Sequence, residues 1–199
     1  MAGRPGENFR VHPDALNITL PDWTAGYVAR QPEAVDDAAR MGLAIALSRE
    51  NVLAGSGGPF GAAVFDADGR RPLAIGVNLV EAAGNACLHA EIVALMFAQA
   101  AVRSWTLRRA AAAPRVLYTS CTPCAMCLGA VLWSGVGRLV CGATREDALA
   151  LGFDEGPVFA ESWRYLETRG VGIELGVLAA EAREVFTLYK ARGGLVYNA

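Results

Sequence analysis

The clearest helical pattern in the chain runs from Glu33 to Ala54, where apolar residues recur every third or fourth position. Acidic residues stand at the start of this segment, where they interact favourably with the helix dipole. Helices are also predicted over Leu88–Arg103 and Ala179–Ala191, and the latter has charged residues on the face opposite its apolar side chains. The pattern therefore predicts long helices in both halves of the chain.

Short runs of β-forming residues lie between these helices. The segment Ala62–Phe65 ends at the turn Asp66–Gly69, so we expect Leu73–Asn78 to return beside it as a hairpin. The remaining predicted elements are strands over Arg115–Thr119, Arg138–Cys141 and Gly172–Leu175, helices over Pro123–Ser134 and Arg145–Leu151, and a loop over 79–87. Strands that alternate with helices predict an α/β fold in which a mixed sheet is covered on both faces.

The two ends of the chain differ from this central part. Residues 1–35 contain several prolines and no sustained period, which predicts an irregular N-terminal arm laid against the body. A length of 199 residues suits one domain with appendages. We therefore divide the chain into the arm (1–35), a domain that carries the candidate chemistry (36–161) and a C-terminal extension that contains the last helix (162–199).

Composition and charge narrow the range of functions. With 53% hydrophobic and 19% charged residues, the chain is typical of a globular protein. Its net charge of −2 and its scattered arginines provide no basic face for nucleic acid, so a small-molecule ligand fits better. The longest apolar runs are too short to cross a bilayer and the N-terminus lacks a signal pattern, so we expect no membrane association and a cytoplasmic location.

Three of the five cysteines lie close together, at Cys121, Cys124 and Cys127. In a reducing compartment this crowding indicates a metal site more than a disulfide framework. Upstream, His89-Ala90-Glu91 supplies an imidazole and a carboxylate. Together with Pro123-Cys124-Ala125-Met126-Cys127, it reproduces the H-x-E and P-C-x-x-C signature of zinc-dependent deaminases. The signature predicts one Zn²⁺ per subunit, with His89, Cys124 and Cys127 as its ligands.

Each part of this signature has a physical reason. Two cysteines three residues apart at the start of a helix point the same way, and the helix dipole lowers the pKa of their thiols. With His89 as the third ligand, a fourth position stays open for water. Glu91 beside that position would take a proton from the water, pass it to a ring nitrogen and help to protonate departing ammonia.

The sequence leaves other interpretations of these residues open. A Cys-x-x-Cys pair also occurs in structural zinc sites and in redox pairs. Cys121, three residues before Cys124, is an alternative ligand, and spacing alone does not exclude Glu91 as a fourth ligand. We expect Cys87, Cys121 and Cys141 to be packing residues, because unpaired cysteines are usually buried and inert.

Taken together, these residues resemble the cytidine deaminase-like superfamily and, within it, the guanine deaminase branch. The resemblance extends from Asp36 to Glu161. It includes the segments Pro59–Ala62, Asn78, His89–Glu91, Tyr118–Cys121, Pro123–Cys124, Met126–Ala130 and Trp133. It implies a three-layer α-β-α fold with a five-stranded mixed sheet, which agrees with the predicted order of elements.

The resemblance also implies roles for residues around the metal. Phe60 would stack on a purine, Asn78 would hydrogen-bond its polar edge, and Trp133 would help to wall the pocket. Each has a structural alternative: core packing for the two aromatic residues and a strand-end turn for Asn78. Guanine deaminases carry a Gly-Phe-Asp-Asp element where this chain has Gly152-Phe153-Asp154-Glu155.

This element implies two more residues of the site. Glu155 would accept hydrogen bonds from adjacent ring N–H groups and serve as a second catalytic proton relay, with Asp154 beside it at the substrate. The alternative is a pair of solvated acids on a loop. In the family, the C-terminal segment often closes a neighbouring subunit's site. Tyr197 would then complete the pocket in a homodimer with exchanged C-terminal segments.

The predicted function is zinc-dependent conversion of guanine to xanthine and ammonia. The N-terminal arm, the longer tail and Glu155 in place of aspartate depart from the shorter guanine deaminases, and they leave the exact substrate open. An aminotriazine or cytosine deaminase is the nearest alternative. A tRNA adenosine deaminase needs a basic surface that is lacking here, and a non-catalytic zinc-stabilised interaction module has no need of Glu91.

Overall fold

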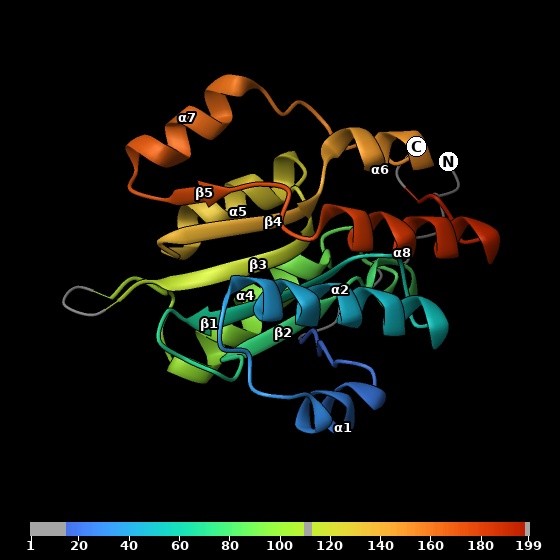
Figure 1. Cartoon of the computed structure of the whole chain (residues 1–199), viewed down its shortest axis with the longest axis horizontal. Helices are drawn as coiled ribbons and strands as arrows, with labels where there is room; N and C mark the ends of the chain where they lie inside the picture. Colours follow the sequence, from blue (N-terminus) through green and yellow to red (C-terminus); the bar gives the residue numbers. More distant parts are fainter. Residues whose placement is uncertain (1–14, 110–112, 198–199) are drawn as a thin grey trace, which may run out of the picture.

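The computed structural model describes residues 15–109 and 113–197, which form a five-stranded sheet with helices on both faces (Figure 1). The strands are β1 (Gly61–Asp66), β2 (Ala74–Val77), β3 (Arg115–Cys121), β4 (Arg138–Ala143) and β5 (Gly172–Glu174). The helices are α1 (Trp23–Arg30), α2 (Asp37–Leu53), α3 (Val80–Ala83), α4 (Ala90–Val102), α5 (Ala125–Ser134), α6 (Arg145–Leu151), α7 (Ala160–Thr168) and α8 (Ala179–Ala191). The predicted α/β fold class is confirmed.

The sheet is mixed, and its strand order is β2-β1-β3-β4-β5. Strand β1 pairs antiparallel with β2 and β3, whereas β3, β4 and β5 run parallel to one another. The start of β1 and the ends of β2, β3 and β4 therefore lie along the same edge of the sheet. We call this edge the carboxyl end, and ligands of open α/β sheets commonly bind there.

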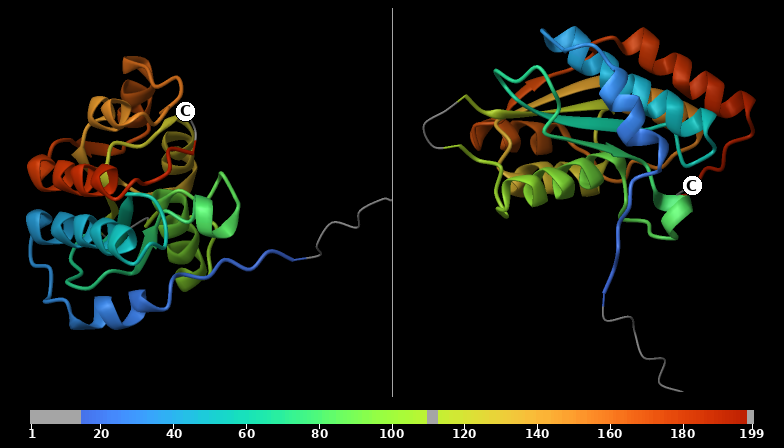
Figure 2. Two further views of the ribbon diagram at one scale, coloured as in Figure 1. Left: turned by 90° about the vertical axis from the view of Figure 1, so that its right-hand side faces the viewer. Right: turned by 90° about the horizontal axis from the view of Figure 1, so that it is seen from below.

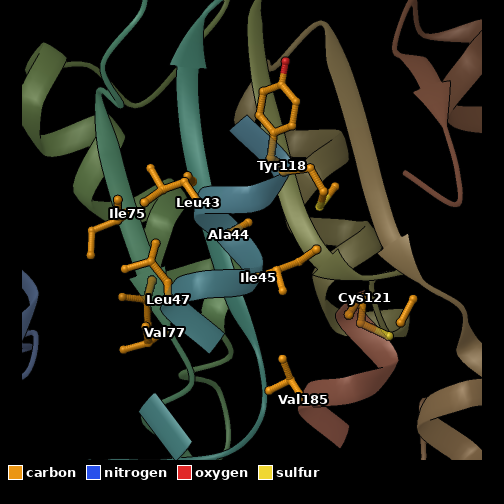
Figure 3. Close-up of a cluster of buried hydrophobic side chains, with 14 of the residues drawn as sticks. Leu43, Ala44, Ile45, Leu47, Ile75, Val77, Tyr118, Cys121 and Val185 are labelled. Carbon is orange, nitrogen blue, oxygen red and sulfur yellow. The ribbon is translucent and has the colours of Figure 1, made fainter. Parts of the chain in front are cut away.

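Alternate residues of each strand face opposite helical layers. Tyr118 of β3 packs in one cluster with Leu47 of α2 and Val185 of α8 (Figure 3). The preceding residue of β3, Leu117, faces the opposite side of the sheet. It belongs to a second buried cluster, which includes Val131 of α5. Figure 2 shows the resulting layers, with α2 and α8 on one side of the sheet and α4 and α5 on the other.

Gly76 allows helix α4 to lie directly against β2. A Cβ atom at this position would lie 2.1 Å from the Ala90 carbonyl oxygen and 2.4 Å from the Ala94 nitrogen, which is closer than side chains permit. Glycine therefore lets the two backbones approach. The close approach fixes the first turn of α4 beside the carboxyl end of the sheet.

The structure corrects three parts of the predicted element order. The arm predicted as irregular over residues 1–35 contains α1, where Thr24 donates its hydroxyl to the Pro21 carbonyl at 2.8 Å and Val28 packs on the core. A helix of this length depends on tertiary packing more than on its own propensity, and the prolines scattered through residues 1–35 favour an irregular arm. Helix α3 lies within the predicted loop, and α7 lies in a segment with no predicted structure.

The residues predicted as a C-terminal extension share the core of the preceding domain. Strand β5 pairs with β4, and Phe186 of α8 packs with the sheet and α2. The division at residue 161 stays a prediction. Within the described ranges, the helices lack the combination of length and apolar character that a bilayer span requires.

Candidate metal centre and active site

His89, Cys124 and Cys127 lie together at the carboxyl end of the sheet. One ligand atom of each residue lies within 4.8 Å of those of the other two, and Cys124 Sγ lies 3.5 Å from His89 Nδ1. Both cysteines are buried, and His89 is partly exposed. The structure thus brings together the three ligands predicted from the signature.

Two helix starts hold these side chains in place. His89 and Cys124 are the N-cap residues of α4 and α5, each with an extended backbone, and Cys127 lies in the first turn of α5. Unpaired N–H groups and the positive end of the dipole at a helix start favour anionic sulfur. The Cys127 thiol and the His89 imidazole hydrogen-bond to Cys124, which lowers the pKa of Cys124 to about 4.

This donor set fits a zinc ion. Two thiolates and one imidazole balance the charge of the dication, and three protein ligands are typical of catalytic zinc sites with an open position. The alternative ligand Cys121 hydrogen-bonds through Sγ to the Thr144 carbonyl at 3.4 Å, and the metal-ligand cluster within the described residues does not include it. The chosen pair, Cys124 and Cys127, is therefore the better assignment.

Two buried carboxyl groups lie beside the candidate ligands. Glu91 is only 6% exposed and Glu155 only 7%. Burial and the nearby Cys124 thiolate raise the pKa of Glu91 to about 7 and that of Glu155 to about 8. Carboxyl groups with pKa values raised in this way are suited to exchange protons near neutral pH.

The loop that carries Glu155 is attached to the start of the cysteine helix. The Glu155 carbonyl accepts a hydrogen bond from Ala125 N at 3.0 Å, and Arg145 donates to the Gly156 carbonyl at 3.1 Å. Asp154 is exposed, and its carboxylate accepts from Gly156 N at 2.8 Å. Glu155 is therefore held near the ligands, while Asp154 shapes the loop from its outer side.

Asn78 and a group of aromatic side chains complete the site. Asn78 is fully buried at the end of β2, and its Nδ2 donates to the Tyr197 hydroxyl at 2.7 Å. The Tyr197 ring centroid lies 5.0 Å from that of Phe153 and 6.3 Å from that of His89. Phe60 makes an edge contact with Phe153 at 5.1 Å. The predicted residues Phe60, Asn78 and Tyr197 thus lie in one neighbourhood.

Tyr197 makes these contacts within its own chain. The exchange of C-terminal segments between subunits is not tested by this contact and stays a prediction. Trp133 is 75% exposed and stands near the far end of α5, about 12 Å along the helix from its first residue. The single chain does not bring Trp133 to the ligand cluster, so its role in walling the pocket also stays a prediction.

Two residues of this region were not assigned a role from the sequence. Phe153 is 1% exposed and contacts Phe60, Tyr189 and Tyr197. Asn51 of α2 is fully buried against the backbone of the Asn78 region. The sequence does point to Asn51 as unusual. It lies four residues after Leu47, so it places a polar amide on the apolar face of its helix.

Comparisons with known proteins agree with this geometry. The profile described as cytidine and deoxycytidylate deaminase zinc-binding region matches residues 35–143. The guanine deaminase of Bacillus subtilis (strain 168) is 36% identical over 128 residues, which cover 64% of this chain and 78% of that protein. A guanine deaminase structure from Nitrosomonas europaea is 39% identical with a TM-score of 0.84, covering 91% of this chain and 99% of that chain.

A further solved structure shows a related protein with a ligand. The NE0047 protein in complex with 2,6-diaminopurine is 40% identical to this chain with a TM-score of 0.85, and the match covers 93% of this chain and 97% of that chain. The matched profile spans both halves of the zinc signature, from His89 to Cys127. The chain belongs to the zinc-dependent cytidine and deoxycytidylate deaminase family.

Proposed function

We propose that this deaminase hydrolyses guanine to xanthine and ammonia. The observation that carries the proposal is the cluster of His89, Cys124 and Cys127 beside two buried carboxyl groups, Glu91 and Glu155. Support for guanine comes from the relatives, because the match to this chain covers 78% of one guanine deaminase and 99% of another. One of the related structures also binds a purine, 2,6-diaminopurine.

The reaction replaces a carbon–nitrogen bond with a carbon–oxygen bond. When bound by His89, Cys124 and Cys127, zinc supplies the Lewis acidity that makes a water nucleophilic near neutral pH. Glu91 takes one proton from the attacking water and delivers it to the ring nitrogen beside the reacting carbon. Glu91 then moves the second proton from the new hydroxyl to the amine, which leaves as ammonia.

Glu155 is proposed to recognise the purine and to assist proton transfer. Its buried carboxyl group lies near Glu91 and Cys124, whose negative charges add to the rise in its pKa. A carboxylate can accept hydrogen bonds from two adjacent N–H groups, which guanine offers. A ring that lacks those donors would leave a buried acceptor unpaired and would bind more weakly.

Phe60, Asn78 and Tyr197 are proposed to hold the ring. The Asn78 amide combines a donor and an acceptor, which suits the mixed polar edge of a purine. Phe60 is partly exposed and offers aromatic surface, and the buried Phe153 ring packs against both Phe60 and Tyr197. The Tyr197 ring also contacts His89. Trp133 and Asp154 are kept as weaker candidates, because both are exposed in the single chain.

The oligomeric state and location belong to the same proposal. We propose a cytoplasmic homodimer in which C-terminal segments either close their own site or exchange. The exposed residues Trp133 and Phe159 provide apolar surface for a second copy. Size-exclusion chromatography with light scattering tests the dimer, and a stable monomer with full activity would contradict it. Cell fractionation tests the location.

A substrate panel tests the proposed reaction. Zinc-loaded protein is incubated with guanine, adenine, cytosine, guanosine, an aminotriazine and an anticodon stem-loop that contains adenosine, and ammonia release is measured. We expect the highest kcat/KM for guanine. A higher value for cytosine, the aminotriazine or the stem-loop would replace guanine as the substrate, and no release from any of them would favour a non-catalytic zinc module.

A further inference from the structure

A buried amide links helix α2 to the backbone around Asn78. Asn51 has no exposed surface, and its Nδ2 donates hydrogen bonds to two carbonyl oxygens, those of Gly58 and Asn78, each at 3.0 Å. A side-chain amide has two N–H donors, and here both are used. Asn51 therefore joins the glycine-rich turn before β1 to Asn78, the residue that follows β2.

The two carbonyl acceptors fix the orientation of this amide, and the N-terminal arm reaches its oxygen through Ser56. Ser56 donates its hydroxyl to Asn51 Oδ1 at 2.8 Å, and Trp23 of α1 donates its indole N–H to Ser56 Oγ at 3.1 Å. Turning the Asn51 amide over would place its oxygen against two carbonyl oxygens. Trp23, Ser56 and Asn51 thus form one directed chain of hydrogen bonds that ends on the Asn78 backbone.

Both backbone polar groups of Asn78 are hydrogen-bonded, and the glycine-rich turn packs against its carbonyl oxygen. Its backbone N–H donates to the Phe60 carbonyl at 3.1 Å, and its carbonyl accepts from Asn51. A Cβ atom on Gly57 would lie 2.0 Å from the Asn78 oxygen, so the turn packs directly on this residue. With its backbone fixed, Asn78 directs its side chain to Val80 N and to the Tyr197 hydroxyl.

We infer that Asn51 is a positioning residue for Asn78, and that helix α1 acts on substrate recognition through Trp23 and Ser56. The inference rests on the proposed role of Asn78 in binding guanine. A single hydrogen bond adds little net stability, so the main effect of this buried chain is to define one geometry. It gives the N-terminal arm a function in the site, although α1 itself contributes no residue to the metal centre.

Two conservative substitutions test the inference by enzyme kinetics. Trp23→Phe keeps the ring and removes the indole N–H, and Ser56→Ala removes the hydroxyl. We expect each to raise KM for guanine about 5-fold with kcat within about 2-fold, since Asn78 contacts the substrate before and during the reaction. Trp163→Phe, which changes a half-buried tryptophan of α7, is the matched control and should leave KM unchanged.

A double-mutant cycle separates positioning from a general loss of structure. In an Asn78→Ala background, Ser56→Ala should no longer raise KM, because the residue on which it acts is gone. An undiminished effect in that background would overturn the inference. Ser56→Thr keeps a hydroxyl and should restore most of the affinity.

Hydrogen exchange supplies a readout that does not depend on the substrate. In the zinc-loaded protein, Trp23→Phe and Ser56→Ala should accelerate exchange of the Asn78 and Val80 amides about 5-fold and leave β3 unchanged. Unchanged exchange at both amides would overturn the inference. If exchange accelerates but the wild-type protein does not deaminate guanine, the proposed function fails and the positioning of Asn78 stands.

Discussion

The carboxyl groups at the two ends of the central sheet have pKa values that are shifted in opposite directions. At the amino ends of β3 and β4, Asp37 receives two hydrogen bonds from Arg138, at 3.0 and 2.6 Å, and another from the Tyr118 hydroxyl. These bonds hold the pKa of Asp37 below its ordinary value. At the carboxyl end, burial raises the pKa of Glu91 and Glu155 instead.

This difference separates structural charge from functional charge. Asp37 finds its countercharge within the protein, so its ionised form favours the folded state. In the part of the chain that the structure describes, neither Glu91 nor Glu155 forms an ion pair with an arginine or lysine. Their burial disfavours the ionised form, and the charge of Arg145 only partly offsets this for Glu155. Carboxyl groups with raised pKa beside potential metal ligands indicate proton transfer rather than stability. Substitutions at the two ends should therefore affect different properties.

The largest expected effect is that of Glu91→Gln on turnover. Gln keeps the size of the side chain but cannot move protons, so kcat for guanine should fall about 1,000-fold or more. Zinc content and melting temperature should stay close to the wild-type values. Ammonia release, metal analysis and calorimetry measure the three quantities, and near-normal turnover would show that Glu91 is not the proton carrier.

A smaller loss is expected for Glu155→Gln. One of its two acceptor oxygens becomes a donor group, so kcat/KM for guanine should fall about 100-fold with zinc retained. The control is Glu146→Gln, which changes an exposed acid of α6 and should have no effect. Equal kinetics of the Glu155 and Glu146 variants would remove Glu155 from the site.

At the other end of the sheet, Asp37→Asn should reduce stability and spare activity. Loss of the charge-assisted bonds to Arg138 should lower the free energy of unfolding by about 1 to 2 kcal/mol, because Asp37 is partly exposed and solvent weakens the pair. Chemical denaturation measures this change. A large loss of kcat with unchanged stability would break the comparison between the two ends.

The pH dependence of the stability difference between wild type and Asp37→Asn is the control for this prediction. Because the folded-state pKa of Asp37 is lowered, its contribution is fully present above the ordinary value of about 4 and is lost as the pH falls through the lowered pKa. The stability difference between wild type and Asp37→Asn should be constant near neutral pH and shrink in acid. A difference that grows in acid would contradict the assigned direction.

The smallest expected effect is that of Tyr197→Phe. The substitution removes the hydroxyl that accepts from Asn78, so KM for guanine should rise about 3-fold with little change in kcat. Steady-state kinetics with Tyr165→Phe as an exposed control measures the change. A loss comparable to that of Glu91→Gln would assign Tyr197 to the chemistry instead of to binding.

Local patterns were sufficient to predict the sheet and the cluster of candidate metal ligands. His89 and the two cysteines occur in short motifs at predicted helix starts. The expected fold places these helix starts at the same edge of the sheet, so it also predicts that the three side chains lie close together. Asn51 and Asn78 are different, because their contact depends on how the glycine-rich turn packs over the end of β2. Helix α1 was missed for a related reason, because a helix of eight residues depends on tertiary contacts, here those of Trp23, Tyr27 and Val28 with the core.

Zinc content of three proteins tests the central claim most directly. Wild type, Cys124→Ala and Cys121→Ala are purified under identical conditions, and bound zinc is measured by native mass spectrometry. The account predicts one zinc per chain in wild type and in Cys121→Ala, and none in Cys124→Ala. Absence of zinc from the wild-type protein, or its loss from Cys121→Ala and retention by Cys124→Ala, would contradict the assignment.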